Sequence, residues 1–310
     1  MTTLRIGSRG SKLALWQAHF IRDEIAREQG VTAEIVIIKT SGDRFQQVGV
    51  GQIGLKGVFI KELEDALLER EVDFAVHSMK DVPTEIPAGL AFPAIYRRVD
   101  VRDCLVARGG MKFADLPLGA RLGTSSLRRQ AQLRHLRPDL TVLELRGNVD
   151  TRLRKLDEGQ YDAIALAKAG LDRLGWSEKI TDVFSAESVL PAVGQGALGI
   201  ECRKEDAHVI AMLAKLDHAE TRACVAAERA LLAKLEGGCQ VPLGAWGRME
   251  AGRLLLDAIV LAADGSEHLR DSISGSPENA EALGRALAEK LLAAGAGRLL
   301  QLAGRANYGS

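Results

Sequence analysis

Short apolar segments alternate with amphipathic segments through the first two hundred residues of this 310-residue chain. Residues 4–6, 34–38 and 73–76 have the composition of buried strands, while residues 13–20 and 59–67 place apolar side chains on one face of a helix. Strands that alternate with helices are typical of parallel α/β sheets. We therefore expect an α/β fold built on a parallel-type sheet.

The pattern begins again after the first hundred residues. Residues 104–107, 140–145 and 163–167 resemble buried strands, and helices are expected to start near Ser125 and Asn148. This second set has the same order of strands and helices as the first.

Two short sequence echoes relate the halves. RIGS at residues 5–8 recurs as RLGT at residues 121–124, and DFAV at 73–76 is matched loosely by DAIA at 162–165. Echoes of four residues arise by chance, so alone they are weak. Together with the matching strand order they predict two similar lobes that face a cleft.

The sequence changes in character from about Ala219. A helical face over residues 224–235 ends at the glycine pair 237–238, as expected of a helix C-terminus. A strand-like segment at 254–261 and an Ala/Leu-rich helix after Pro277 follow. We expect a small third α/β domain, in keeping with a chain too long for one ordinary core.

Two segments look like crossings between the first two lobes, namely residues 97–100 and the glycine-rich residues 191–199. The expected domains are lobe 1 at residues 1–98 plus about 197–216, lobe 2 at 99–196, and a C-terminal domain at 217–310.

The charge balance argues against a general nucleic-acid binder. Lys+Arg and Asp+Glu number 41 each, and aromatic residues for base stacking make up 4%. The N-terminus resembles no signal peptide, and no stretch approaches the roughly 18 apolar residues of a membrane span. We expect a cytoplasmic protein with no membrane segment, whose four cysteines stay reduced and whose Cys and His spacing indicates no metal site.

Three glycine/hydroxyl turns precede helices, at residues 7–11, 123–126 and 146–148. Free N–H groups at a helix start bind anions, and the same residue types also serve as ordinary helix caps. For a single turn capping is the better interpretation. Three such turns, two of them containing Arg, favour ligand binding.

Basic residues are concentrated between Arg121 and Lys155, where nine occur against three acids. Some of them belong to solvated helix faces. Four others lie at or just inside helix starts, where a cation opposes the helix dipole: Arg128, Arg129, Arg146 and Arg152. Because arginine forks bind carboxylates bidentately, a ligand with several carboxylates is the simplest explanation.

HSMKDVP, at residues 77–83, follows a predicted strand. Ligands of open α/β sheets bind at the carboxyl ends of strands, and proton transfer needs a rigidly aimed acid. Lys80 and Asp81 could equally form a surface ion pair of little value. The placement favours Asp81 as a working acid. His77 could be a second acid or base, but a hydrogen-bonded structural residue is the better interpretation.

Cys239 lies in GGCQVP, at residues 237–242. A thiol on a Gly-Gly turn is exposed and mobile, whereas Cys104 and Cys224 lie in apolar runs typical of buried cysteines. No pattern of a cysteine protease accompanies Cys239, and no second cysteine lies nearby for redox exchange. The residues alone indicate a reactive or modified thiol.

Six motifs in order resemble the hydroxymethylbilane synthase (porphobilinogen deaminase) family over essentially the whole chain. They are GSRGSKLALWQA (7–18), HSMKDVP (77–83), GTSSLRRQ (123–130), LRGNVDTR (145–152), PAVGQGA (191–197) and GGCQVP (237–242).

The resemblance implies three domains, the first two similar to the lobes of type II periplasmic binding proteins around a cleft. It also implies a covalent dipyrromethane cofactor on a thioether to Cys239, with no metal. Four porphobilinogen units are added to that primer with loss of ammonia, and hydroxymethylbilane is released by hydrolysis, in porphyrin biosynthesis. The implied enzyme is a transferase, and we expect it to be a monomer.

The resemblance also implies residue roles. Asp81 would protonate the leaving amine and then, as a carboxylate, stabilise the cationic azafulvene. The implied cofactor-binding residues are Lys80, Asp81, Thr124, Ser126, Arg128, Arg129 and Arg146, and the implied substrate-binding residues are Arg9, Ser11, Arg152 and Arg173. The chain departs from the family at Leu55, where the family often has glycine, and residues 43–47 are less acidic than expected.

Two rival functions fit part of the sequence. A solute-binding protein or the effector domain of a regulator would have two similar lobes, but it would leave Cys239 and the third domain unexplained, and neither a signal peptide nor a DNA-binding helix pair is apparent. An RNA-binding protein would need aromatic residues among the basic ones, and residues 121–155 contain no Phe, Tyr or Trp.

Overall fold

The computed structural model describes residues 3–39, 60–235 and 241–301. The chain divides into two compact units, residues 1–99 with 196–222 and residues 100–195 with 223–310. Two of the unit boundaries, after residues 99 and 195, fall in the segments that the sequence indicates as crossings. The limits of the three expected domains stay a prediction.

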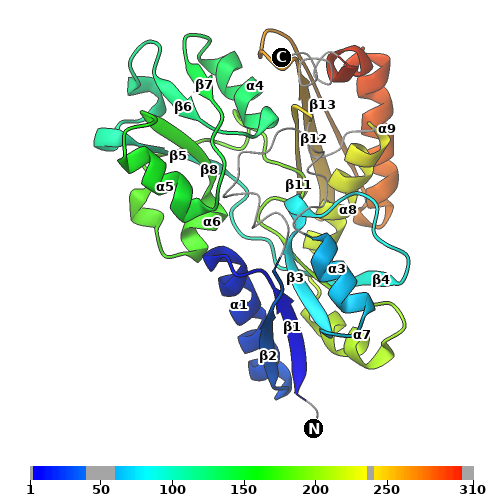
Figure 1. Cartoon of the computed structure of the whole chain (residues 1–310). Helices are drawn as coiled ribbons and strands as arrows, with labels where there is room; N and C mark the ends of the chain where they lie inside the picture. The colour runs from blue at the N-terminus through cyan, green and yellow to red at the C-terminus, as the bar shows by residue number, and fades with distance from the viewer. Residues whose placement is uncertain (1–2, 40–59, 236–240, 302–310) are drawn as a thin grey trace. The chain divides into compact units, whose positions relative to one another are not determined.

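The first unit contains a five-stranded sheet in the order β2-β1-β3-β10-β4 (Figure 1). Strand β1 pairs in parallel with β2 and β3, whereas β10 is antiparallel to β3 and β4. The strands are β1 (Leu4–Ser8), β2 (Ala33–Ile37), β3 (Phe74–Ser78), β4 (Leu90–Tyr96) and β10 (Leu198–Arg203).

Helices cover both faces of this sheet. Helices α1 (Lys12–Gln29) and α7 (Ala207–Leu213) contribute Ile21, Ile25 and Met212 to the same core as Phe74. Helix α3 (Lys61–Leu68) packs Leu63 and Leu67 against Ala75, the next residue along β3. Successive strand residues point to opposite faces, so the four buried residues 74–77 show that β3 is covered on both sides.

The second unit contains a sheet of the same plan, in the order β7-β6-β8-β5-β9. Strand β6 is parallel to β7 and β8, and β5 is antiparallel to β8 and β9. The elements are β5 (Asp103–Ala107), β6 (Arg121–Gly123), α4 (Leu127–Leu136), β7 (Thr141–Leu143), α5 (Val149–Asp157), β8 (Ala163–Ala167), α6 (Lys168–Arg173) and β9 (Asp182–Val183).

The sequence echoes correspond to one repeated interaction. Arg5 donates from its backbone N–H to Asp73 Oδ2 at 2.8 Å, and its Nη2 meets Oδ1 at 3.0 Å. Arg121 makes the same contacts with Asp162, at 2.8 Å each. Each pair joins two parallel neighbours, β1 to the start of β3 and β6 to the start of β8. Two similar α/β lobes are therefore present, as expected.

The expectation of a parallel-type sheet is wrong for one position in each lobe. Strands β5 and β10 run antiparallel to their neighbours. An apolar run fits a buried strand of either direction, so its periodicity carries no information on strand polarity. Strand β10 also begins inside residues 191–199, which the sequence suggested were only a crossing.

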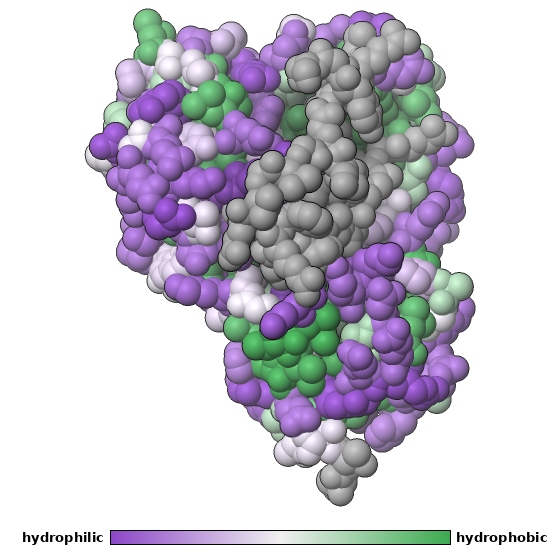
Figure 2. All heavy atoms as spheres, viewed as in Figure 1, coloured by the Kyte–Doolittle hydropathy of each residue, from purple (hydrophilic) through white to green (hydrophobic). Residues whose placement is uncertain are grey.

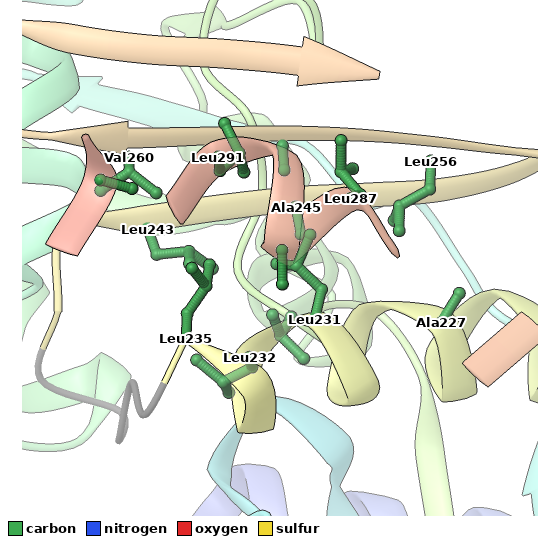
Figure 3. Packing of buried hydrophobic residues seen from close by; sticks show 14 of the residues in the cluster. Ala227, Leu231, Leu232, Leu235, Leu243, Ala245, Leu256, Val260, Leu287 and Leu291 are labelled. Atoms are coloured by element: carbon green, nitrogen blue, oxygen red, sulfur yellow. The ribbon is translucent and has the colours of Figure 1, made fainter. Parts of the chain in front are cut away.

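The remainder of the second unit is a smaller antiparallel sheet, in the order β11-β12-β13. Its strands are β11 (Leu243–Glu250), β12 (Arg253–Leu261) and β13 (His268–Gly275), and its helices are α8 (Ala219–Lys234) and α9 (Ala280–Ala293). Leu231 of α8 and Leu287 of α9 meet Leu256 of β12 in one core (Figure 3). Each is fully buried and stabilises the fold by about 1.5–3 kcal/mol. The expected α/β class with a smaller third part is confirmed.

The described residues contain no helix that is both long enough and apolar enough to cross a membrane. The face of the molecule drawn in Figure 2 is mainly hydrophilic, with hydrophobic residues gathered in patches.

Candidate active site

Asp81 lies at the carboxyl end of β3, in the 3-10 turn Met79–Asp81. Its side chain is exposed, and that of Lys80 is half-buried. The residues on either side, Met79 and Val82, are 3% and 4% exposed. The turn is thus held by two buried apolar anchors, which fix the backbone that presents the carboxylate.

Helix α1 supports the same strand end. Gln17, which is buried, donates from Nε2 to Ser78 Oγ at 2.8 Å. Ser11 caps α1 by accepting a hydrogen bond from the N–H of Ala14 at 3.3 Å. Because β1 and β3 are parallel neighbours, the turn with Arg9 and Ser11 lies at the same sheet edge as Asp81.

His77 is a buried part of β3. Its Nε2 lies 3.0 Å from Glu201 Oε2, on the neighbouring strand β10, and both side chains are at most 4% exposed. Nearby, burial and then the charge of Glu201 raise the pKa of Glu64 on α3. The burial of His77 supports a structural role, but its Nε2 makes no hydrogen bond among the described residues, so the predicted hydrogen bond is not seen at this atom.

In the second unit, Thr124 and Ser126 form the turn from β6 into α4. Thr124 is fully buried, and its Oγ1 accepts from the N–H of Ser126 at 3.3 Å. Ser126 Oγ in turn accepts from the N–H of Arg129 at 3.5 Å, as a helix cap. The capping interpretation therefore holds at the starts of α1 and α4. Whether these turns also bind a ligand stays a prediction.

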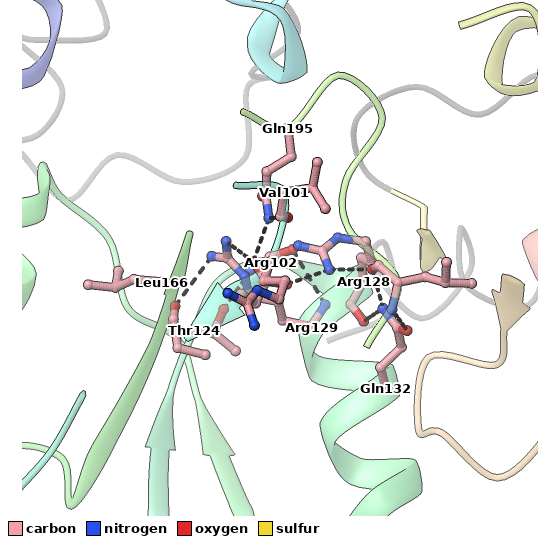
Figure 4. Close-up of polar contacts among 12 residues, drawn as sticks. Val101, Arg102, Thr124, Arg128, Arg129, Gln132, Leu166 and Gln195 are labelled. Carbon is pink, nitrogen blue, oxygen red and sulfur yellow. Dashed lines mark hydrogen bonds and ion pairs between the residues drawn. The ribbon is translucent and has the colours of Figure 1, made fainter. Parts of the chain in front are cut away.

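Arg128 and Arg129 lie in the first turn of α4 and are 4% and 6% exposed. Arg128 Nη1 donates to Asp103 Oδ2 at 2.6 Å, and Arg129 Nη2 donates to Asp103 Oδ1 at 2.7 Å (Figure 4). Gln195 donates to the same carboxylate from Nε2 at 2.9 Å. The arginines thus form a buried polar cluster with one acid.

The electrostatics of this cluster follow from its composition. Burial alone would raise the pKa of Asp103, but the charges and hydrogen bonds of Arg128 and Arg129 hold it well below its usual range. Burial lowers the pKa of Arg128, against the opposing effect of Asp103. Two guanidiniums face one carboxylate, so these three residues carry an excess of one positive charge.

The other predicted arginines differ in exposure. Arg146 is exposed, and its Nε donates to Glu144 Oε1 at 2.6 Å. Arg152 is half-buried and donates from Nε to the carbonyl of Gly147 at 2.7 Å. Burial lowers the pKa of Arg173, the last residue of α6, to about 10.

The sheet topology of the second unit brings its predicted site residues to one edge of the sheet. Strands β6, β7 and β8 are parallel, so the segments that follow them emerge at one sheet edge. Thr124 follows β6, Arg146 follows β7, and α6 with Arg173 follows β8. In each lobe the predicted site residues therefore gather at the carboxyl edge of the sheet.

Cys239 lies outside the described residues, as do Leu55 and the whole of residues 42–57. The other three cysteines are buried free thiols. Burial raises the pKa of Cys104 to about 12 and that of Cys202 to about 11, which keeps both protonated and unreactive.

Asp103 was not predicted from the sequence to be part of this site. The signal that could have found it is a charged residue at the head of the apolar run DCLVA, where a buried acid needs a cationic partner. Gln195 was quoted within PAVGQGA, but no role was assigned to it.

Comparisons with known proteins agree on one family over nearly the whole chain. Residues 4–211 match the family model described as porphobilinogen deaminase, dipyromethane cofactor binding domain, and residues 222–293 match the porphobilinogen deaminase C-terminal domain. The porphobilinogen deaminase of Desulforudis audaxviator is 54% identical over 95% of this chain and 96% of its own length. That of Geobacter metallireducens is 52% identical over 96% of this chain and 93% of its own length.

Among solved structures, the periplasmic VFT2 domain of Bordetella pertussis BvgS matches with a TM-score of 0.42 and 14% identity, covering 69% of this chain and 86% of that domain. An ancestral arginine-binding protein bound to arginine matches with a TM-score of 0.38 and 17% identity, covering 70% of this chain and 91% of that protein.

Proposed function

The chain belongs to the porphobilinogen deaminase family, and from this premise we propose how its own residues divide the work of the reaction. The enzyme is a transferase. It adds four porphobilinogen molecules to a covalent dipyrromethane primer, with loss of ammonia at each addition, and then releases hydroxymethylbilane by hydrolysis. The observation that carries the proposal is Asp81, an exposed acid on a turn held by buried neighbours at a sheet edge.

The second unit fits an anionic cofactor. The cluster of Arg128, Arg129 and Asp103 carries an excess positive charge, although charge is costly to bury. The Nε atoms of both arginines are buried and meet no hydrogen-bond partner among the described residues. An anion at this sheet edge would offset that cost, and each pyrrole of a dipyrromethane carries an acetate and a propionate.

When bound, the dipyrromethane supplies the primer on which the product chain is built. We assign its binding to residues of both sheet edges: Lys80, Asp81, Thr124, Ser126, Arg128, Arg129 and Arg146. Arg9, Ser11, Arg152 and Arg173 are assigned to the carboxylates of the incoming substrate. Guanidinium forks suit this task because they bind carboxylates bidentately.

Asp81 is assigned the proton transfer. As an acid it gives its proton to the departing amine of porphobilinogen, and as a carboxylate it then faces the cationic azafulvene that the substrate becomes. A fixed backbone with an exposed side chain serves both steps, since the carboxyl group stays aimed and can regain a proton.

Cys239 is assigned the thioether to the cofactor, as an anchor that does not turn over. The proposal also includes three domains at the limits given above, and a cytoplasmic monomer that acts on small molecules and binds no nucleic acid. The equal numbers of acids and bases and the lack of aromatic residues at 121–155 support the last part.

The test is Asp81→Asn, which keeps the size of the side chain and removes its proton. We expect turnover of porphobilinogen to fall by at least about a hundredfold, because general acid catalysis contributes roughly 10²–10⁴ in rate. The intact mass should still include the cofactor.

The matched control is Asp115→Asn, an exposed acid that also ends a 3-10 turn, Phe113–Asp115. Its turnover should equal that of the wild type. Normal turnover by the Asp81→Asn enzyme would remove Asp81 from the mechanism.

A further inference from the structure

Asp103 is fully buried, yet it is ionised and has no role in the reaction as assigned above. It is the first residue of β5, whose five residues are all buried. A buried carboxylate is costly unless every oxygen is satisfied. Its presence in this strand therefore needs a reason.

The carboxylate divides its two oxygens between the two arginines. Oδ2 accepts from Arg128 at 2.6 Å, while Oδ1 accepts from Arg129 at 2.7 Å. This arrangement differs from the usual bidentate fork, in which one arginine uses both oxygens. It fixes the spacing between the two neighbouring guanidiniums. It also leaves the Nε–H group of each arginine without a hydrogen-bond partner among the described residues.

Each arginine is also held at a second point. Arg128 Nη1 donates to the carbonyl of Leu190 at 2.7 Å, and Arg129 Nη1 donates to the carbonyl of Ala165 at 3.3 Å. The side chain of Gln132 holds the backbone of Leu190 in turn. Gln132 Oε1 accepts from the N–H of Leu190 at 2.7 Å, and Gln132 Nε2 donates to the carbonyl of Leu190 at 3.0 Å. The carbonyl that accepts from Arg128 is therefore held in place by Gln132, and Figure 4 shows Gln132 beside Arg128.

Gln195 fixes the carboxylate itself. Its Nε2 donates to Asp103 Oδ1 at 2.9 Å and to the carbonyl of Val101 at 2.7 Å. Gln195, the last residue of the segment 100–195, thus holds Asp103 and is itself held by the loop before β5. An acid that merely balanced charge would not need such anchoring.

We propose that Asp103, held by Gln195, is a positioning residue that sets the spacing of the Arg128 and Arg129 guanidiniums for one carboxylate of the cofactor. The proposal rests on the proposed function, in which both arginines bind the cofactor. Asp103 balances one of the two arginine charges, so one positive charge remains for that ligand. Because each carboxylate oxygen of Asp103 binds a different arginine, Asp103 determines the positions of both guanidiniums.

The test compares Asp103→Asn, Asp103→Glu and Arg129→Gln. Asp103→Glu keeps the charge but moves it by one methylene, so it separates position from charge. For each purified holoenzyme we would measure the cofactor-bearing fraction by intact mass, the kcat and KM for porphobilinogen per cofactor-bearing molecule, and the midpoint of thermal unfolding. Asp162→Asn is the matched control, since it breaks an Asp–Arg pair in the same sheet, with Arg121.

We expect Asp103→Glu to unfold cooperatively while its kcat falls about tenfold to hundredfold, because small misplacements of binding groups have effects of that size. Its KM should change much less. Asp162→Asn should lower stability at most and leave kcat unchanged. If neither Asp103 variant folds, Gln195→Met removes one anchor without a change of charge and should also lower kcat.

Two outcomes overturn the proposal, and they differ in what they reject. If Arg129→Gln loses activity while the folded Asp103 and Gln195 variants lose only thermal stability, with kcat per cofactor-bearing molecule unchanged, then Asp103 is structural. If Arg129→Gln itself keeps the cofactor and wild-type kcat, the proposed role of the arginine in cofactor binding fails as well.

Discussion

Asp81 and the two arginines of α4 work in opposite environments. The carboxyl group of Asp81 is exposed, whereas Arg128 and Arg129 are almost fully buried. An exposed acid exchanges protons readily, and a buried cation acts on a ligand with little screening by water or salt. The exposure of each residue therefore suits the role assigned to it.

A second buried acid allows a test of stability at the scale of one residue. Glu228 of α8 accepts from the N–H of Gly194 at 2.6 Å and from the N–H of Gly247 at 2.7 Å, with one carboxyl oxygen for each. In Glu228→Gln an amide NH₂ would face one of these donors. We expect a loss of about 1–3 kcal/mol in the free energy of unfolding, measured by urea denaturation.

Glu220→Gln is the control, because it changes an exposed glutamate in the first turn of the same helix. It should cost less than about 1 kcal/mol, the usual limit for a charge near a helix end. Equal losses in the free energy of unfolding for the two variants would contradict a stabilising role for the buried hydrogen bonds of Glu228.

At the scale of elements, periodicity located most of the α/β strands to within two residues. Residues 163–167 are strand β8 as predicted, and the helix predicted after Pro277 is α9. The antiparallel course of β5 and β10 could not be predicted, because direction depends on which strand is the neighbour in space. Asp103 was missed for a related reason: its partners on α4 are 25 and 26 residues away.

One glycine shows how closely two elements of the second unit approach. Gly265, in the turn between β12 and β13, has φ of +78°, and a Cβ there would lie 2.5 Å from the carbonyl oxygen of Ala131 on α4. Gly265→Ala should therefore combine backbone strain with a clash, at a cost of about 2–4 kcal/mol in the free energy of unfolding.

The matched control is Gly252→Ala, in the turn between β11 and β12. Gly252 has a similar φ of +76°, but a Cβ there would meet nothing within 4 Å. Its cost should be limited to the strain, about 1–2 kcal/mol. Urea denaturation of both variants measures the difference, and equal losses would contradict the close approach of this turn to α4.

For the whole molecule, the sequence established the function class more fully than the geometry of the site. The chain has no net charge, yet nine basic residues lie against three acids between Arg121 and Lys155. The structure shows that two of them, Arg128 and Arg129, are buried with an acid, while Arg146 is exposed. Sequence alone could not separate them, because burial depends on tertiary packing.

The central claim is that this chain carries a dipyrromethane on Cys239 and extends it at a site that includes Asp81. The intact mass of the purified protein tests it most directly, together with the mass of the peptide that contains Cys239. We predict a mass above that of the bare chain by one dipyrromethane, located on that peptide and lost in Cys239→Ala. A bare-chain mass that persists after incubation with porphobilinogen would contradict the account.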